Sequence, residues 1–282
     1  MQPSVTIGMP VRNGFPALKS ALDSLLRQQF QDFELVISDN CSEDETGTIC
    51  AGYAQTDSRI RYFRQDHDIG PMANFEFVLK QARGRLFMWA AHDDLWQENW
   101  LAALVPRIKE DVVMAYGQIR GLDDRTGSLT PPIVLEFPGA SFARGMAYFF
   151  AQEKEGKANL IYGLFRKDAL SRHKFPKGSK FRFGSDMHIV FTAIQLGTFV
   201  FEARAGMSKT LKASEINPER GGTIGSLPLA IDIITYYLGY LRHVHSVLLG
   251  IALLCAVPIK CSWSVGAGVQ RQIRRLVRCV VL

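Results

Sequence analysis

The feature that most constrains the fold of this chain is an alternation of short apolar runs with longer helix-like segments. Each run has the length of a strand that is buried on both faces. Strands that alternate with helices at this spacing indicate a parallel sheet built from right-handed crossovers. The sequence therefore predicts an α/β fold with a mostly parallel sheet flanked by helices. The predicted strands are residues 4–9, 33–38, 59–64, 85–91 and 112–116.

The segments between these runs carry the signals of helices. Residues 16–29 place Leu18, Leu22 and Leu25 on one face, and Pro16 suits the first turn. Ser42 followed by Glu45 is typical of a capping box that starts the next helix. The remaining helices predicted in this region are residues 43–55, 71–82 and 97–109.

The alternation ends after about residue 117. Residues 118–142 are rich in Gly, Asp and Pro, which predicts an irregular or hairpin insertion. Beyond it we expect a loop at 214–226 and a helical, strongly apolar stretch at 227–257. The elements predicted between these segments are a helix at 144–154, a strand at 159–165, a short helix from Lys167 and a helix at 186–196.

Four polar segments follow the ends of predicted strands, which is where parallel α/β sheets bind ligands. Each segment alone has an ordinary explanation as a turn, a helix start or a pair of solvated acids. Their joint occurrence at predicted strand ends favours a ligand site. The segments are PVRNG at 10–14, SDNCSEDET at 38–46, GPMAN at 70–74 and HDD at 92–94.

The acidic residues of these segments suggest the chemistry of the ligand. Asp39 precedes the predicted cap, so its carboxylate is placed to accept an N–H from a pyrimidine base. Asp93 and Asp94 offer the oxygen ligands that Mg²⁺ or Mn²⁺ prefers, and a diphosphate bridged by that cation would neutralise both acids. Neither GxGxxG nor GxxxxGK[ST] occurs, which disfavours a dinucleotide dehydrogenase or a P-loop NTPase.

In their order and spacing, PVRNG, SDNCSEDET, DIGPMAN and AHDDL resemble the nucleotide-sugar-binding half of a family 2 glycosyltransferase with the GT-A fold. The resemblance covers roughly residues 3–115. It implies a nucleotide-sugar donor and a divalent cation, Mg²⁺ or Mn²⁺, bound by Asp94. It also implies that Asp39 pairs with uracil or thymine. The full set of implied donor contacts in these segments is Pro10, Arg12, Asn13, Asp39, Gly70, Asn74 and Asp93.

Two positions depart from the family pattern. Arg12 stands where the family often has an aromatic residue, although a guanidinium can also stack on a base. His92 stands where a second acid of the metal motif often occurs, so phosphates and water would have to complete the shell of the cation.

The second half of the chain offers a general base and further donor contacts. Asp186 resembles the family's acidic base ahead of a helix, whereas its ordinary explanation is a helix N-terminal acid stabilised by the dipole. His188 is the alternative base. Asn159 and Gly163 lie in a stretch that resembles the donor-sugar segment, and its apolar alternation equally fits an ordinary strand.

The resemblance implies a catalytic domain over residues 1–226, with a nucleotide-sugar-binding half at 1–117 and an acceptor half at 118–226. The implied reaction moves a sugar, with inversion, from a UDP or dTDP donor to a hydroxyl of a glycan or lipid-linked acceptor, in bacterial surface polysaccharide synthesis. The alternatives are a non-catalytic nucleotide-sugar-binding or scaffold protein and a sugar-1-phosphate nucleotidyltransferase.

The remaining residues, 227–282, are expected to form an apolar and basic helical tail. The chain has a net charge of +6, and no acid follows Asp232. The apolar run 244–257 is shorter than the roughly 20 residues that a spanning helix needs, so a spanning helix is not favoured. Residues 269–282 mix arginines with aliphatics, which predicts either a helix lying on an anionic membrane or a helix packed on the catalytic domain.

The expected location follows from three further features of the sequence. No secretory signal precedes the first strand, and the five scattered cysteines fit a reducing compartment and argue against a zinc site. Nucleic acid is not an expected partner, because basic and aromatic residues do not interleave. We therefore expect a cytoplasmic protein, peripheral on the inner face of the cell membrane.

Overall fold

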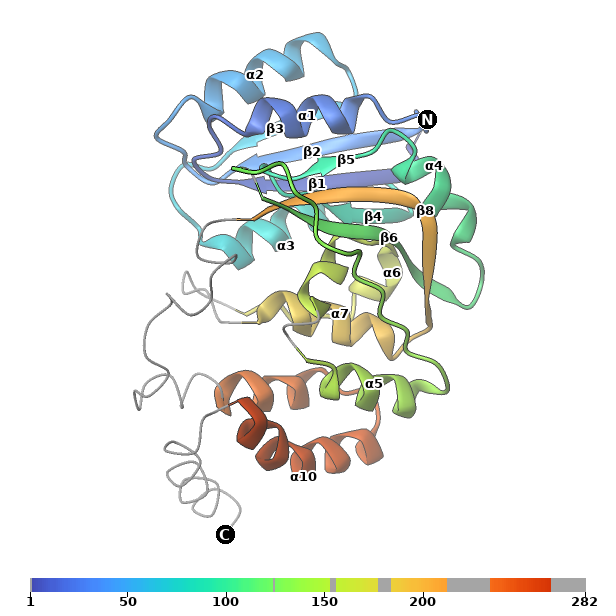
Figure 1. Ribbon diagram of the computed structural model, residues 1–282. Coiled ribbons are helices and arrows are strands. Elements are labelled where there is room, and N and C mark those ends of the chain that lie inside the picture. The colour runs from blue at the N-terminus through green and yellow to red at the C-terminus, as the bar shows by residue number, and fades with distance from the viewer. Residues whose placement is uncertain (1, 124, 153–155, 177–183, 212–233, 265–282) are drawn as a thin grey trace.

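The computed structural model describes residues 2–123, 125–152, 156–176, 184–211 and 234–264. Its centre is an eight-stranded sheet in the order β3-β2-β1-β4-β7-β6-β8-β5, with helices on both faces (Figure 1). The strands are β1 (Val5–Val11), β2 (Phe33–Asp39), β3 (Ile60–Arg64), β4 (Leu86–Trp89), β5 (Leu95–Trp96), β6 (Val112–Asp123), β7 (Leu164–Arg166) and β8 (Thr198–Leu211).

Helices of very different length connect and cover these strands. The α-helices whose bounds are described are α1 (Leu18–Leu26), α2 (Thr46–Thr56), α3 (Pro71–Gln81), α4 (Trp100–Leu104), α5 (Ser141–Phe150), α6 (Lys167–Leu170), α7 (Ser185–Ile194) and α10 (Val247–Ser264). The described 3₁₀ turns are η1 (Val105–Arg107), η3 (Lys157–Tyr162) and η5 (Tyr240–His243). Within the described ranges, every helix is too short or too polar to cross a bilayer.

The pairing confirms the predicted α/β fold. Strand β1 pairs in parallel with β2 and β4, β2 pairs in parallel with β3, and β6 pairs in parallel with β8. Short strands add antiparallel pairs, since β7 lies between β4 and β6 and β5 lies beside β8. The result is a mixed sheet in which the four parallel pairs carry the topology.

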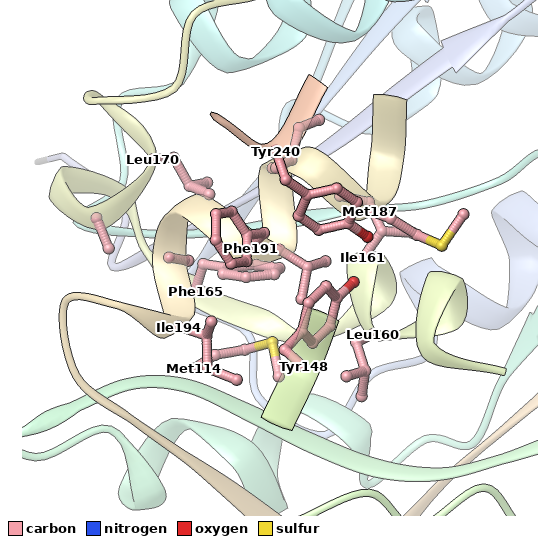
Figure 2. Close-up of a cluster of buried hydrophobic side chains, with 14 of the residues drawn as sticks. Met114, Tyr148, Leu160, Ile161, Phe165, Leu170, Met187, Phe191, Ile194 and Tyr240 are labelled. Carbon is pink, nitrogen blue, oxygen red and sulfur yellow. The ribbon is translucent and has the colours of Figure 1, made fainter. Parts of the chain in front are cut away.

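Two apolar cores lie on opposite faces of this sheet. One joins the sheet to α1 and α4, and includes Leu22, Trp100 and Leu104. The other joins the sheet to α3, α5, α7 and α10. Figure 2 shows its centre, where side chains from α5, α7, η3 and η5 interlock around Phe191 and Tyr240. The rings of these two residues pack edge to face, with 4.8 Å between their centroids.

Several local predictions differ from the observed elements. Residues 159–165 form a 3₁₀ turn and then the short strand β7, rather than one strand. Residues 97–109 break into α4 and η1. Pro16 precedes α1 instead of lying in its first turn. The insertion at 118–142 does contain a hairpin, since β6 extends to Asp123 and the returning chain bridges to it.

The predicted loop at 214–226, the domain boundary at 226/227 and the basic segment 269–282 lie outside the described residues. The described part of the tail packs on the rest of the chain. Helix α10 contacts α5, and a Cβ on Gly145 of α5 would lie only 2.8 Å from Leu249 of α10. The missing side chain therefore lets the two helices approach closely.

Two buried lysines attach to the carboxyl end of α5. Lys260 of α10 donates from Nζ to the carbonyls of Phe150 and Ala151, at 3.0 and 2.9 Å. Lys157 of η3 donates to the carbonyls of Tyr148 and Phe149, at 3.3 and 3.4 Å. The last carbonyls of a helix have no intrahelical donor, and these ammonium groups supply one.

Replacing Lys260 by Met should therefore destabilise the protein. The two carbonyls lose their buried donor, so we expect the free energy of unfolding to fall by about 1–3 kcal/mol. Urea unfolding followed by circular dichroism measures this change. The exposed Lys19→Met variant is the control and should stay within about 0.5 kcal/mol of the parent. Equal stability of the two variants would show that the buried ammonium does not hold α10.

Candidate active site

The turn after β1 and the turn after β2 interlock. The hydroxyl of Ser42 accepts the N–H of Asn13 at 2.9 Å, and the side chain of Asn13 accepts the N–H of Glu43 at the same distance. Asn13 has a positive φ of 50°, which an asparagine tolerates better than most residues. The N–H of Gly14 reaches the hydroxyl of Thr46 at 2.7 Å. The segments PVRNG and SDNCSEDET thus form one structural unit.

This arrangement makes the capping-box prediction wrong. Helix α2 begins at Thr46, and the carboxylate of Asp44 accepts the Thr46 N–H at 3.0 Å. The hydroxyl of Ser42 is already occupied by the turn after β1. The role of Ser42 is thus set by a contact with a residue 29 positions away, and the local sequence pattern does not predict it.

Asp39 is a fully buried carboxylate at the end of β2. Its Oδ1 accepts the N–H of Ser42 at 2.9 Å. Its Oδ2 accepts from the Tyr62 hydroxyl at 3.0 Å and from Arg64 Nη1 at 2.9 Å. Burial and the negative charge of Asp39 together raise the pKa of Tyr62 to about 12. Asp39 therefore organises the strand ends, and its predicted pairing with a base remains a prediction.

Asp68 is a site residue that the sequence did not single out. It forms an ion pair with Arg12, and its Oδ1 accepts from Asn40 at 2.6 Å and from the Gly70 N–H at 2.8 Å. These donors, the Gly70 N–H first, lower the pKa of Asp68. One carboxylate thereby connects the turn after β1, the end of β2 and the start of α3. Arg12 is anchored and exposed, as a base-stacking guanidinium would have to be.

The start of α3 is anchored to strand β2 by a buried side chain. Gly70 has φ 83° and ψ 156°, a conformation that is essentially restricted to glycine. Asn74 is buried, and its amide donates to the carbonyl of Ser38 at 2.9 Å. The Oδ1 atom of Asn74 has no hydrogen-bond partner among the described residues. Asn74 is thus an anchor between α3 and β2, beneath the surface on which a donor would lie.

The acidic pair lies beyond the end of β4 and is held by β8. Asp94 is buried, and its Oδ1 accepts the N–H of Thr210 at 3.1 Å. The hydroxyl of Thr210 donates to the carbonyl of Asp93 at 2.6 Å. The imidazole of His92 lies over the first turn, within 3.1 Å of where a Cβ on Gly14 would stand. His92 therefore fills space beside PVRNG, and the Asp93 side chain is half-buried.

The donor set here fits a hard divalent cation only in combination with a substrate. Asp93 and Asp94 provide carboxylate oxygens at one strand end. The described residues contain no cluster of three or more His, Cys, Asp or Glu side chains that could hold a metal ion by itself. A cation such as Mg²⁺ commonly uses one or two carboxylates and takes its other ligands from substrate phosphates and water.

Asp186 lies in the first turn of α7, after Gly184 at φ 75°. Its Oδ1 accepts the N–H of Met187 at 2.9 Å. The residue is half-buried, and burial of the carboxyl raises its pKa above the usual range. Lys209 and Lys157 oppose this shift. Lys209 precedes Thr210 in β8, so Asp186 and the acidic pair lie near the same strand.

His188, the alternative base, belongs to the core. Its Nε2 lies 3.0 Å from the carbonyl of Tyr236, and its ring packs on those of Tyr236 and His243. Burial, with a smaller effect of His243, lowers the pKa of His188 to about 3. A half-buried imidazole of this kind, kept neutral by its surroundings, supports packing, and the assignment of a general base remains a prediction.

The two residues predicted to line the donor sugar lie in different surroundings. Asn159 is half-buried in η3. Gly163 is buried, and a Cβ at this position would lie 2.8 Å from the sulfur of Met114 in β6. Close packing against β6 explains the glycine without a ligand, while the predicted sugar contacts themselves remain predictions.

The hydrogen bonds that Asp39 accepts lead to a prediction about the stability of the protein. In Tyr62→Phe, a fully buried carboxylate loses one donor that water cannot replace, so the free energy of unfolding should fall by about 1 kcal/mol. The control is Tyr53→Phe, which removes a 2.7 Å hydrogen bond to Asp23, a carboxylate in contact with solvent. Urea titration should find a smaller loss in the control. Equal losses would mean that Asp39 is not protected from water.

The mixed eight-stranded sheet with helices on both faces matches the fold of solved GT-A glycosyltransferase structures. The S. aureus protein TarS, as a 1–349 fragment in complex with UDP-GlcNAc, matches with a TM-score of 0.65. The identity is 15%, over 91% of this chain and 71% of that chain. The mannosyltransferase PcManGT of Pyrobaculum calidifontis, in complex with GDP-Man and Mn²⁺, matches with a TM-score of 0.60. It is 14% identical, over 93% of this chain and 72% of that one.

The family model of glycosyl transferase family 2 matches residues 6–173, and this chain belongs to that family. A Campylobacter jejuni relative is named GalNAc(5)-diNAcBac-PP-undecaprenol beta-1,3-glucosyltransferase. It is 26% identical over 178 residues, which are 61% of this chain and 55% of that protein. The uncharacterized glycosyltransferase EpsJ of Bacillus subtilis is 34% identical over 94 residues, 33% of this chain and 27% of that protein. The chain thus spans about half or less of these relatives.

Proposed function

We propose that this chain is an inverting glycosyltransferase that uses a nucleotide-diphosphate sugar, with UDP or dTDP favoured, and a glycan or lipid-linked acceptor. Two relatives support the choice of substrates. TarS has been seen with UDP-GlcNAc, and the name of the Campylobacter relative specifies an undecaprenol-linked glycan. The proposed setting is bacterial surface polysaccharide synthesis at the inner face of the cell membrane.

The carboxyl ends of β1, β2 and β4 form the proposed donor site. Pro10 and Arg12 would flank the base, with Asn13 as a further donor contact, and Asp39 would pair with uracil or thymine. Gly70, fixed by Asp68, and Asn74 would lie near the nucleotide or sugar. Asp93, the more accessible acid of the pair, would contact the ribose or sugar.

A divalent cation completes the proposed site. Asp94, with Asp93 beside it, would hold Mg²⁺ or Mn²⁺, and the bound cation would stabilise the charge on the departing diphosphate. Thr210 keeps Asp94 in place from the neighbouring strand β8. The acceptor hydroxyl would lose its proton to the Asp186 carboxylate as its oxygen attacks the anomeric carbon.

The observation that carries this proposal is the environment of Asp186. A carboxyl whose pKa is raised is a stronger base than an ordinary solvated aspartate, provided that it is ionised. The acid lies at the start of α7, and Lys209 connects it electrostatically to the strand that holds Asp94. A helix N-terminal acid with only a structural role would gain nothing from a burial that disfavours its charge.

Donor choice can be tested with a panel of nucleotide sugars in a thermal-shift assay, with and without Mn²⁺ or Mg²⁺. We expect UDP or dTDP sugars to raise the melting temperature more than GDP sugars, and only with a cation present. In Asp94→Asn this cation-dependent shift should vanish, because the carboxylate charge is lost. The same shift in the presence of a chelator would contradict the metal proposal.

Transfer itself can be tested with Asp186→Asn. Donor binding should be unchanged, while kcat should fall by about 10²–10⁴, because the base can no longer accept the proton. The control is Asp168→Asn, an acid in the first turn of α6 that pairs with Arg166 on the surface. It should keep the parent rate. A parent protein with neither transfer nor donor hydrolysis would instead favour a non-catalytic nucleotide-sugar-binding protein.

The raised pKa of Asp186 also predicts the pH dependence of the stability. The folded state favours the protonated carboxyl, so its contribution to stability is present at low pH and is lost as pH rises through the raised pKa. At neutral pH, Asp186→Asn should therefore be more stable than the parent, and the difference should shrink below about pH 4. Urea unfolding at both pH values measures it. A variant that is less stable at neutral pH would indicate a structural role.

A further inference from the structure

On the face of the sheet that α7 covers, the outermost described layer includes α5 and α10, which lie on the side of α7 away from the sheet (Figure 1). The water-facing side of α10 is apolar. Val247, Leu248 and Ile251 are 80, 72 and 57% exposed, and Leu254 and Ile259 follow on the same face. The opposite face, with Leu249, Leu253 and Val257, is buried against the protein.

The neighbouring helix α5 repeats this pattern. Its exposed residues are Phe142, Ala143 and Ala147. Arg144 is its only charged residue, and its guanidinium is buried, with hydrogen bonds to the carbonyls of Ile194 and Gly139. The only charged residue of α10 is Lys260, whose ammonium turns inward to α5. Neither helix therefore presents a charge to solvent.

A helix on the surface of a soluble protein normally carries polar residues on its outer face, and a helix that is apolar on all sides is normally covered. Among the residues that the structure describes, helix α10 is covered on one side only. The exposed stripe runs along several turns of the helix, so scattered surface residues do not account for it.

A group of cations borders the start of this stripe. Arg172, Lys174 and Arg242 are exposed. Arg242 and Lys174 lie close to His243, where they add to the effect of burial and lower its pKa to about 4. Arg172 acts in the same way on the exposed His245, two residues before α10. Farther along the chain, the sequence adds Arg271, Arg274, Arg275 and Arg278, and no acid.

We propose that the apolar face of α10, bordered by Arg172, Lys174 and Arg242, docks onto the surface of an anionic phospholipid bilayer. Apolar side chains beside cations match the acyl boundary and the headgroups of such a surface. A second copy of the chain would bring the same cations to the interface, so charge complementarity favours the lipid. Since α5 covers the inner face of α10, the helix would lie along the bilayer. This inference does not rest on the proposed reaction.

Cosedimentation of the full-length protein with vesicles tests the proposal. The protein should bind vesicles of phosphatidylcholine with phosphatidylglycerol more tightly than pure phosphatidylcholine, and high salt should weaken the binding. The double variant Leu248→Glu/Ile251→Glu should reduce the partition coefficient at least about tenfold. The matched control Leu129→Glu changes an exposed leucine of the hairpin after β6 and should bind as the parent does.

A second variant, with its own control, tests the cations that border the apolar face of α10. Arg172→Glu/Arg242→Glu should lose the preference for anionic vesicles, while Lys19→Glu/Arg83→Glu, with the same change in charge at exposed positions elsewhere, should keep it. Circular dichroism confirms that each variant is folded. The proposal is overturned if the parent binds neither vesicle, or if the α10 variant binds as tightly as the parent. Light scattering measures the oligomeric state. If the α10 variant only converts a dimer into monomers, the apolar face is a dimer interface and the proposal is likewise overturned.

Discussion

The parallel register of β1, β2, β3 and β4 decides where the polar segments of the candidate site lie. Val11 stands opposite Asp39, and Asp39 stands opposite Arg64. A parallel pairing brings carboxyl ends together, so the loops that follow these strands share one edge of the sheet. A slip of one residue would turn Asp39 to the other face of β2, away from Arg64 and Tyr62. The apolar runs that fill both cores hold this register.

Two carboxylates turn that edge into one rigid unit. Asp39 is buried and satisfied by three donors, whereas Asp68 is more exposed and connects three segments. Buried charges are retained when hydrogen bonds replace the lost water. The loops therefore have a defined shape before any ligand arrives, which reduces the entropy that binding must remove.

The first half of the fold was predictable from the sequence because its strands are apolar runs and because turn-forming residues such as Gly and Pro precede its helices. Strand β8 was not, since Thr198–Leu211 mixes charged residues, glycine and apolar residues without a clear period. Its Thr210 binds Asp94 across 116 residues of sequence, and short motifs carry no information on such a contact. Asp68 was missed for a related reason: a single acid in a loop becomes informative only when its partners are known.

The order of the helices beneath the sheet links the far end of the molecule to the candidate base. Lys260 fastens α10 to the carboxyl end of α5, and Arg144 of α5 holds the carbonyl of Ile194 at the last residue of α7. Helix α7 carries Asp186 at its other end. These hydrogen bonds join α10, α5 and α7 in series. Any surface that captures α10 would consequently fix the tilt of the whole domain, and with it the height at which the strand ends face an acceptor.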